Sequence, residues 1–459
     1  MTSGGFRVVV VGGGPAGSAA ALRLARLGHK VTLVERQSFP RDHVGEALSP
    51  GVALQLEWLG LGGDFLDRHG ARRHRASAAR WAGDWEVRPV APGAATVDRA
   101  RFDAALLDAA RMAGVEVLQP ARAASASFAD RWQIAVQAAE GQRALVADFL
   151  VDATGRSGFH GRKRRLLGPR TAALHALWAG TGAGGPRVAA GRDHWIWASP
   201  IPGLGDRVMV FCDPGSLPGD RRGIEAYYWE SVRAAGVCSA GRAEAAPRLC
   251  DASAYVDTGL TGPRFLRVGE AAYAIDPLSS SGVEKAISTG LQSAVAVNTI
   301  LRRPEDSTLA RSFYEEEAAR TVRRQAGWAA SAYAAAGRGA GEPFWAERAA
   351  WAAPEPPLPP PLPGGRLRLA VEARFEAVAV LTGNFVTREE ALVHPRLERP
   401  IAYVAGRKAA PLLRGLQGTA AEIEARLRNG LSDAAAAALL GRMAGAGLLV
   451  PAVEQAPRA

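Results

Sequence analysis

Six residues near the amino terminus form the pattern G-x-G-x-x-G, a loop that binds a dinucleotide pyrophosphate when it joins a strand to a helix. They are Gly12, Gly13, Gly14, Pro15, Ala16 and Gly17. Gly12 permits a tight turn, Gly14 lets a pyrophosphate approach the backbone at a helix N-terminus, and Gly17 lets helix and strand pack closely. The pattern has this meaning only where a strand precedes the loop and a helix follows it.

The flanking residues supply that context. A β-branched run predicts a strand over 6–11, helical periodicity predicts a helix over 15–27, and 30–34 forms a second buried strand. Glu35 ends this second strand, 18 residues after Gly17, where a carboxylate accepts hydrogen bonds from ribose hydroxyls. The segment therefore predicts a dinucleotide site, but it does not distinguish FAD from NAD.

Three further segments distinguish them: Phe39–Glu46, Asp152–Ser157 and Gly269–Val283. With the glycine loop, they resemble the FAD-dependent monooxygenase superfamily of aromatic hydroxylases, geranylgeranyl reductases and flavin-dependent halogenases. The four segments span residues 8 to about 300 and imply FAD as the cofactor. Glu270 stands where the family usually has Asp, so a longer carboxylate must reach the ribityl chain.

The resemblance assigns site residues one by one. It places at the cofactor Gly12, Gly14, Pro15, Ala16, Gly17, Glu35, Arg36, Arg41, Val44, Arg101, Gly155, Gly269, Glu270, Asp276, Pro277, Ser281, Gly282 and Val283. Glu46 is the candidate catalytic residue because its segment is expected beside the flavin. The alternative is that Glu46 only hydrogen-bonds the backbone there.

The segment Trp195–Pro202 resembles the W-x-W-x-I-P signature of flavin-dependent halogenases, which places Trp195, Trp197 and Pro200 on the substrate side. The alternative is that the two tryptophans pack one apolar face of a strand. Halogenases also need a lysine near the substrate, yet no lysine lies between Lys30 and Lys163, and Arg72–Ser77 occupies the matching neighbourhood. Arginine holds its proton too tightly to replace that lysine.

These features favour a hydroxylating monooxygenase, in which a flavin C4a-hydroperoxide transfers OH to an electron-rich ring. A halogenase and a geranylgeranyl-reductase-like flavoprotein remain alternatives. The reducing equivalents are expected from NAD(P)H or from a separate flavin reductase.

The carboxyl-terminal part adds a candidate module. Residues 354–365 are rich in proline and predict a linker, and 366–459 predict a small domain. Thr419–Glu422 predicts a capping box, Ser432 a second helix to about Ala446, and 448–450 a strand. This order resembles winged-helix peptide-recognition domains, which implies a peptide or protein substrate; an ordinary helical packing module is the alternative.

A halogenase-like flavoprotein without the halogenase lysine, carrying such a tail, resembles the flavoprotein monooxygenases that hydroxylate a protein tryptophan to build tryptophylquinone cofactors. The resemblance implies a peptidyl tryptophan as substrate during protein-derived quinone formation. A non-enzyme alternative is a flavin-loaded scaffold that holds a peptide while another protein does the chemistry.

The expected fold is α/β, with a Rossmann-type FAD-binding domain of the aromatic-hydroxylase type. That domain is discontinuous, 1–170 and 262–335, with helices expected over 98–114, 282–300 and 307–335. Short runs between Pro and Gly turns predict an antiparallel substrate-side sheet over 171–261, with part of 70–100. The carboxyl-terminal domain is expected to be small and helical or winged-helix-like.

Composition excludes several classes. The 459 residues carry a formal charge of +11, but the arginines are scattered and no nucleic-acid-reading motif is present. Three cysteines give no disulfide framework, which favours a reducing, cytoplasmic location. The chain shows no signal-peptide pattern and no membrane-spanning apolar run. His43, His74 and His194 are isolated, so no metal site is expected.

Overall fold

The computed structural model describes residues 5–179, 184–238, 241–337, 342–352 and 364–452. The chain divides into two compact units. The first unit comprises Met1–Ser307 and Tyr314–Glu355, and the second comprises Thr308–Phe313 and Pro356–Ala459. All but the last two residues of the predicted linker, 354–365, lie outside the described residues.

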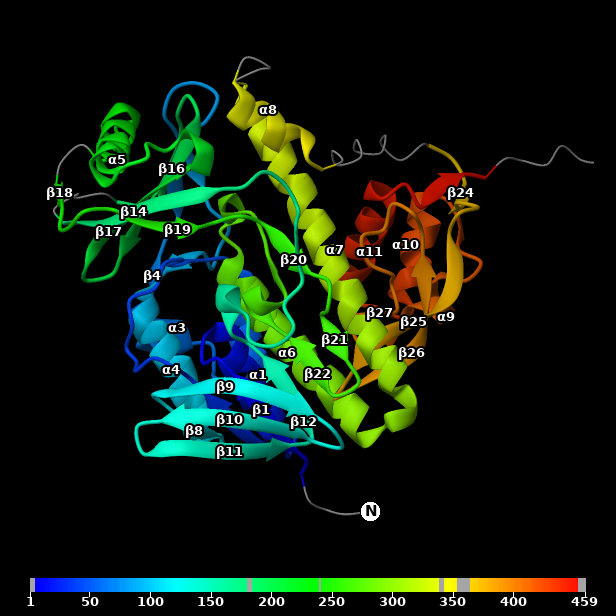
Figure 1. Ribbon diagram of the computed structural model, residues 1–459. Coiled ribbons are helices and arrows are strands. Elements are labelled where there is room, and N and C mark those ends of the chain that lie inside the picture. Colours follow the sequence, from blue (N-terminus) through cyan, green and yellow to red (C-terminus); the bar gives the residue numbers. More distant parts are fainter. Residues whose placement is uncertain (1–4, 180–183, 239–240, 338–341, 353–363, 453–459) are drawn as a thin grey trace, which may run out of the picture. The chain divides into compact units, whose positions relative to one another are not determined.

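A six-stranded sheet forms the centre of the first unit (Figure 1). Its order is β21 (Thr261–Gly262), β22 (Phe265–Arg267), β12 (Phe149–Asp152), β1 (Arg7–Val11), β2 (Lys30–Val34) and β8 (Glu116–Leu118). The strands are parallel except for the β21–β22 pair. Both faces are covered, which explains the nearly continuous valine run of β1.

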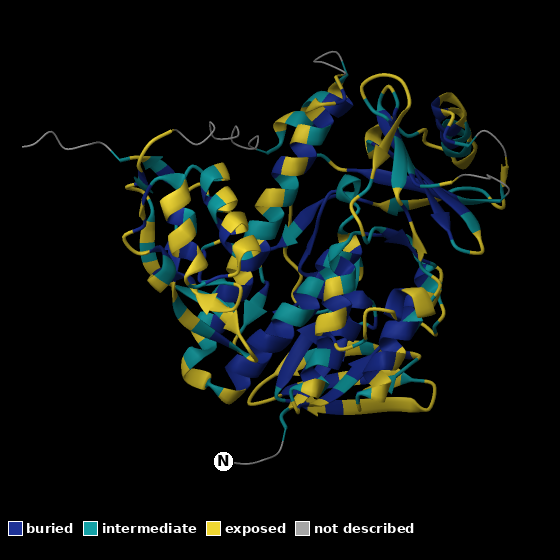
Figure 2. Ribbon diagram, turned by 180° about the vertical axis from the view of Figure 1, so that it is seen from behind, coloured by how far each residue is buried: buried dark blue, intermediate teal, exposed yellow. Residues whose placement is uncertain are grey.

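Helices α1 (Pro15–Arg26), α4 (Arg99–Met112) and α6 (Gly282–Arg302) belong to the same unit, and Figure 2 shows buried residues in dark blue. A Cβ on Gly290 of α6 would lie 2.5 Å from the Ala16 carbonyl oxygen of α1, so the two helices cross in close contact. The predicted βαβ opening and the helices over 98–114 and 282–300 are therefore present.

A three-stranded meander had no counterpart among the predicted elements. Its strands are β9 (Ala121–Phe128), β10 (Trp132–Ala138) and β11 (Gly141–Ala147). Trp132, Ile134 and Val136 alternate along β10 and share one apolar cluster with Val9 and Val11 of β1. The meander thus covers part of the central sheet.

The second large sheet of this unit contains β18 (Arg242–Ala243), β14 (Ala172–Ala179), β17 (Gly205–Cys212), β16 (His194–Ile201), β15 (Arg187–Ala190), β5 (Ala76–Arg80) and β6 (Glu86–Pro89), with β19 (Arg248–Asp251) also paired to β14. Region 171–261 is not wholly sheet, because α5 (Arg221–Ala235) interrupts it. Asp220 caps this helix by accepting from Gly223 N, and left-handed Gly236 ends it.

Helix α7 (Ser307–Ala334) is the long helix expected over 307–335, and α8 (Pro343–Ala350) follows it. Tyr333 and Trp345 from this part of the chain share an apolar cluster with Trp195 and Phe211 of the second sheet.

Smaller elements complete the first unit. They are β3 (Ala47–Leu48), β4 (Arg72–Arg73), β7 (Ala95–Thr96), β13 (Arg164–Leu166), β20 (Tyr255–Asp257), β23 (Tyr273–Ala274), α2 (Gly51–Trp58) and α3 (Phe65–Arg68). Short 3₁₀ turns lie at Gly155–Ser157, Pro214–Ser216, Gly269–Ala271, Pro277–Ser279 and Pro304–Asp306.

The second unit has its own core around Leu413, Ile423, Leu427, Leu439 and Met443. Its elements are β24 (Leu367–Leu369), β25 (Arg374–Thr382), β26 (Phe385–Val393), β27 (Tyr403–Val404), β28 (Arg407–Lys408), α9 (Ala409–Leu413), β29 (Gln417–Gly418), α10 (Ala420–Arg428), α11 (Asp433–Gly445) and β30 (Leu449–Pro451). The predicted capping box of Thr419 and Glu422 is present, and Ser432 caps α11. The strands between 366 and 408 were not predicted.

No helix in the described part of the chain is long and apolar enough to cross a membrane. Among the described residues, no group of three or more metal-ligating side chains is found.

Candidate active site

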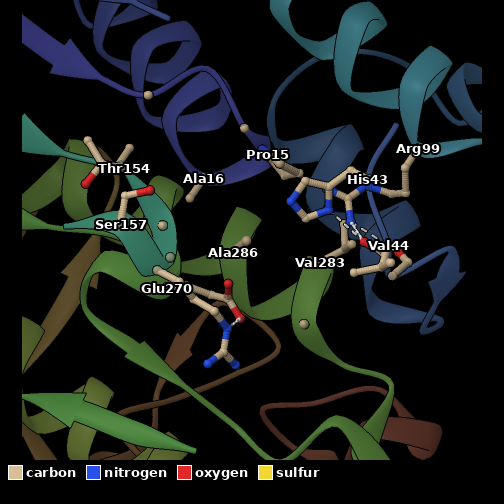
Figure 3. A pocket seen from close by; sticks show the side chains of 18 of the residues that line it. Pro15, Ala16, His43, Val44, Arg99, Thr154, Ser157, Glu270, Val283 and Ala286 are labelled. Atoms are coloured by element: carbon tan, nitrogen blue, oxygen red, sulfur yellow. Dashed lines mark hydrogen bonds and ion pairs between the residues drawn. The ribbon is translucent and has the colours of Figure 1, made fainter. Parts of the chain in front are cut away.

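A cavity of about 780 Å³ opens in the first unit where the glycine loop, the 35–47 segment and the second sheet meet. That volume is within the range of cofactor and ligand pockets. Figure 3 shows part of its wall, with Pro15 and Ala16 of α1 on one side and Val283 and Ala286 of α6 on another. Most of the residues that the resemblance assigned to the cofactor line it: Gly12, Gly14, Pro15, Ala16, Glu35, Arg36, Arg41, Val44, Gly155, Gly269, Glu270, Asp276, Pro277, Gly282 and Val283.

The three motif glycines do different work. Gly12 has a φ of +109°, and a Cβ there would overlap the Ala153 carbonyl. A Cβ on Gly17 would overlap the Gly12 carbonyl, so Gly17 lies behind the loop and outside the cavity wall. Gly14 has an ordinary φ of −68°, and the nearest described atom to its Cβ would be Arg41 Nη2 at 3.6 Å. The protein itself leaves space at Gly14, as a bound pyrophosphate requires.

Glu35 is held at the end of β2 by two backbone donors. Its Oε2 accepts from Gly13 N at 2.6 Å, and its Oε1 accepts from Gln37 N at 2.9 Å. The side chain lines the cavity although the residue is only 5% exposed. Its free lone pairs suit a ribose hydroxyl, as the dinucleotide motif requires.

Arg41 supplies positive charge beside the loop. Its guanidinium lies 3.6 Å from Asp103 and over the ring of Phe39. Its Nε is buried and has no hydrogen-bond partner among the described residues. Burial lowers the pKa of Arg41, and Asp103 and Glu35 oppose that effect. A partly buried guanidinium with an unused donor beside a helix N-terminus suits a pyrophosphate, so these residues fit FAD.

Glu270 reaches the cavity wall from the 3₁₀ turn after β22 (Figure 3). Burial opposes its ionisation, but Arg156, 3.4 Å away, together with Lys285 and other cations, lowers the pKa of Glu270. Lys285 lines the same cavity and donates from Nζ to Tyr273 O at 2.7 Å. Burial lowers the pKa of Lys285 to about 8, against the pull of Glu270.

Lys285 changes the lysine argument made from the sequence. Arg72–Ser77, although described, do not line the cavity, whereas Lys285 reaches it from α6. The absence of lysine between 30 and 163 therefore does not leave the cavity without an amine. The charged groups that act on Lys285 are Glu270 and Arg156, which both lie in the cofactor segments.

Glu46 is 2% exposed and lines the cavity. Its Oε1 accepts from Arg207 Nε at 3.0 Å, and its Oε2 accepts from Gly45 N at 3.0 Å. Burial raises the pKa of Glu46, and Arg207 opposes this. The backbone hydrogen bond considered as an alternative role is thus present, on a carboxylate that also faces the cavity.

Arg101 is a correction. Its side chain is 75% exposed, lies 3.5 Å from Asp98 and does not line the cavity. Arg99 does, with a bidentate pair to Asp103 and a hydrogen bond to Val44 O at 2.9 Å (Figure 3). Two residues turn a helix by about 200°. Arg99 lies three residues before buried Phe102, and this spacing could have identified it.

Two other assigned residues also lie outside the cavity wall. The Ser281 hydroxyl turns back to donate to Ser279 O at 3.0 Å. Pro200 is buried within β16, paired opposite Asp206.

Strands β16 and β17 supply an aromatic wall to the cavity, formed by Trp195, Trp197, Met209 and Phe211. Trp195 stacks on Phe211 with ring centroids 3.9 Å apart and planes 12° apart. Both predicted tryptophans therefore face the cavity. Met209 and Phe211 were missed because nothing in the sequence pairs β17 with β16.

The family model described as "FAD dependent oxidoreductase" matches residues 7–158. Among curated proteins, the chain is 30% identical to the tryptophan 2-halogenase of Chondromyces crocatus over 336 residues, 67% of this chain and 64% of that protein. It is 28% identical to a flavin-dependent halogenase of Armillaria mellea, covering 63% of this chain and 64% of that protein. The chain thus spans slightly less than two thirds of the length of these two relatives.

Two solved structures resemble the chain over almost its whole length. The peptidyl tryptophan dihydroxylase QhpG, essential for tryptophylquinone cofactor biogenesis, has a TM-score of 0.73 and 29% identity, covering 97% of this chain and all of that one. The flavin-dependent halogenase CmlS has a TM-score of 0.81 and 22% identity, covering 98% and 96%, and this likeness shows the fold.

Proposed function

The chain belongs to the FAD-dependent oxidoreductases of the flavin-dependent halogenase and monooxygenase superfamily, and on this premise we propose that it hydroxylates the indole ring of a tryptophan in a peptide or protein. The observation that carries the proposal is the likeness to the peptidyl tryptophan dihydroxylase, at 29% identity over 97% of the chain. The aromatic wall of Trp195, Trp197, Met209 and Phe211 supports it, since a flat apolar surface suits an indole ring.

The cofactor-facing residues bind and orient. Gly14 gives the pyrophosphate access to the N-terminus of α1, Arg41 offers it charge, and Glu35 accepts from the adenosine ribose. FAD, when bound, supplies the redox chemistry that activates oxygen. The N-terminus of α6, at Gly282 and Val283, adds a partial positive charge to the cavity.

The substrate-facing residues position the ring and move a proton. Trp195, stacked on Phe211, forms one flat wall and excludes water. Hydroxylation of a ring carbon replaces its hydrogen by OH, so that hydrogen must leave as a proton. Glu46 is proposed to accept this proton at a carboxylate oxygen: it lines the cavity, and its raised pKa improves it as a base.

The second unit is proposed to bind the peptide or protein that carries the reacting tryptophan. The reducing equivalents are proposed to come from NAD(P)H or a separate reductase. The test incubates the FAD-loaded chain with reduced flavin, oxygen and a tryptophan-containing peptide, with free tryptophan as control. Mass spectrometry should show a peptide gain of one or two oxygen atoms. Equal turnover of free tryptophan would contradict a peptide substrate.

Halogenation is the second candidate, favoured by the 30% identity to a tryptophan 2-halogenase and by Lys285 in the cavity. We rank it lower because Lys285 hydrogen-bonds Tyr273 O and is paired electrostatically with Glu270, among cofactor residues. Including chloride or bromide in the same assay decides between them: a halogenated product supports this candidate, and an oxygenated product alone supports hydroxylation.

A further inference from the structure

Tyr333, near the C-terminal end of α7, contacts one residue of the aromatic wall and one residue of a cofactor segment. It is 1% exposed and belonged to none of the sequence motifs. Trp195 Nε1 lies 3.1 Å from its hydroxyl oxygen. The same oxygen lies 3.2 and 3.1 Å from the two carboxylate oxygens of Asp276. Trp195 belongs to the aromatic wall and Asp276 to a cofactor segment, and both line the cavity.

The direction of these hydrogen bonds is fixed by chemistry. An indole N–H only donates, so the tyrosine oxygen accepts from Trp195 and its single proton goes to Asp276. Burial raises the pKa of Tyr333 well above its usual value, which keeps that proton in place. Asp276 Oδ1 also accepts from Leu278 N at 2.9 Å, which ties the carboxylate to its own turn.

Two ring contacts restrain Trp195 in addition to this hydrogen bond. One face stacks on Phe211, and its ring meets Trp81 edge-on with centroids 6.4 Å apart. An aromatic ring that binds against Trp195 therefore contacts an indole whose N–H already donates to the Tyr333 hydroxyl. A small change in indole orientation alters the hydrogen bond to Tyr333, and through it the environment of Asp276.

We propose that Tyr333 is a positioning residue that couples the aromatic wall to the cofactor segment. An aromatic ring that binds against Trp195 thereby changes the hydrogen bonding of Asp276. The coupling stands on the contacts above. It rests on the proposed function only in taking an aromatic ring as the occupant.

Tyr314 provides a matched control on the same helix. It is also 1% exposed, and its hydroxyl donates to the Arg267 carbonyl at 2.6 Å. Like Tyr333 it does not line the cavity, but it makes neither of the two contacts of Tyr333. Tyr314→Phe therefore removes a buried tyrosine hydrogen bond but keeps the hydrogen bonds that join Trp195, Tyr333 and Asp276.

The first experiment needs no substrate. The FAD dissociation constant and the visible flavin spectrum are measured for the full chain and for Tyr333→Phe, Trp195→Phe, the double variant and Tyr314→Phe. We expect Tyr333→Phe to weaken FAD binding about fivefold, as the loss of one buried hydrogen bond does. As a single substitution, Trp195→Phe should alter the flavin spectrum. In the Tyr333→Phe background it should cause no further change. Tyr314→Phe should leave both measurements unchanged.

Two results would overturn the coupling. One is that Trp195→Phe has the same effect with and without the Tyr333 hydroxyl, which would mean direct contact with the cofactor. The other is that neither single variant changes the flavin. Asp276→Asn repeats the test from the far end of the line, should Tyr333→Phe not fold.

The second experiment adds a tryptophan-containing peptide and measures binding by equilibrium dialysis beside the flavin difference spectrum. We expect the peptide to bind wild type and Tyr333→Phe alike, and the variant to lose at least half of the spectral change. Binding with an undiminished spectral change would refute the coupling and leave the proposed function standing. A peptide that fails to bind wild type would refute the proposed function, while the first experiment still decides the coupling.

Discussion

The two walls of the cavity are built by opposite means. At the cofactor end, the glycine loop, Glu35 and Arg41 present backbone amides and charge, and hydrogen bonds and an ion pair hold the two side chains. At the aromatic wall, Trp195, Met209 and Phe211 come from two strands and pack as an apolar surface, with Tyr333 arriving from α7. The first wall recognises charge by hydrogen bonds, and the second recognises shape by packing. Substitutions at the first wall should therefore weaken cofactor binding most, and substitutions at the second wall should mainly lower turnover.

Gly14→Val is the largest expected break. Its side chain would fill the space left at the N-terminus of α1, and FAD affinity should fall by about 100-fold or more. Absorbance of the purified protein and titration of the apoprotein with FAD measure this. Gly215→Val is the control, because a Cβ there meets no described atom within 4 Å. A fully flavinated Gly14→Val protein would refute the role of the loop.

Glu46→Gln tests whether Glu46 accepts a proton during turnover. Loss of a general base should lower the turnover rate by about 10²-fold or more, while FAD binding persists. Because burial raises the pKa of Glu46, the wild-type rate should rise with pH through a value above 4.5, as the carboxylate ionises. The glutamine variant should lack this acidic limb. An unchanged pH profile would remove Glu46 from proton transfer.

Deleting residues 366–459 sharpens the comparison by leaving both walls in place. FAD binding and uncoupled oxygen reduction should persist. KM for a peptide substrate should rise about tenfold, since contacts beyond the reacting ring would be lost, while KM for free tryptophan should stay the same. Steady-state kinetics on both substrates measure this. Equal kinetics with and without the segment would show that it does not hold the peptide.

Lys285→Met concerns the cofactor end alone, and its expected effect is on stability rather than on turnover. The pKa of Lys285 falls from 10.5 to about 8 on folding, so its charged form weakens the folded protein below pH 8. This penalty disappears as the pH rises from 8 towards 10.5. The fall from 10.5 to about 8 corresponds to about 3 kcal/mol, so the free energy of unfolding of the variant, relative to that of the wild type, should fall by about 2 to 3 kcal/mol between pH 7 and pH 10. Denaturant titrations at the two pH values measure it, and a difference independent of pH would contradict the shift.

The same contrast explains what the sequence could reveal. The glycine loop, the 39–46 segment and the turns near 155 and 276 are local, so their residue types and spacing placed most of the cavity's cofactor end. Arg101 was assigned in place of Arg99, two residues away on the same helix, although Phe102 marked the buried face. Met209, Phe211 and Tyr333 depend on which strand pairs with β16 and where α7 crosses it. Those facts lie in tertiary packing, and no short pattern carries them. Lys285 was likewise visible as a residue but not as a neighbour of the cavity.

Arg207 of β17 adds an evolutionary consequence. Its Nε donates to Glu46 and its Nη2 to Asp42 at 2.7 Å, so one side chain of the second sheet anchors the loop that borders the cofactor. Met209 and Phe211 follow on the same face of the strand. A substitution at Met209 can therefore reshape the cavity while Arg207 still holds Glu46 and Asp42. Side chains two residues apart lie on the same face of a strand. We therefore expect relatives with different substrates to differ at Met209 and to keep Arg207.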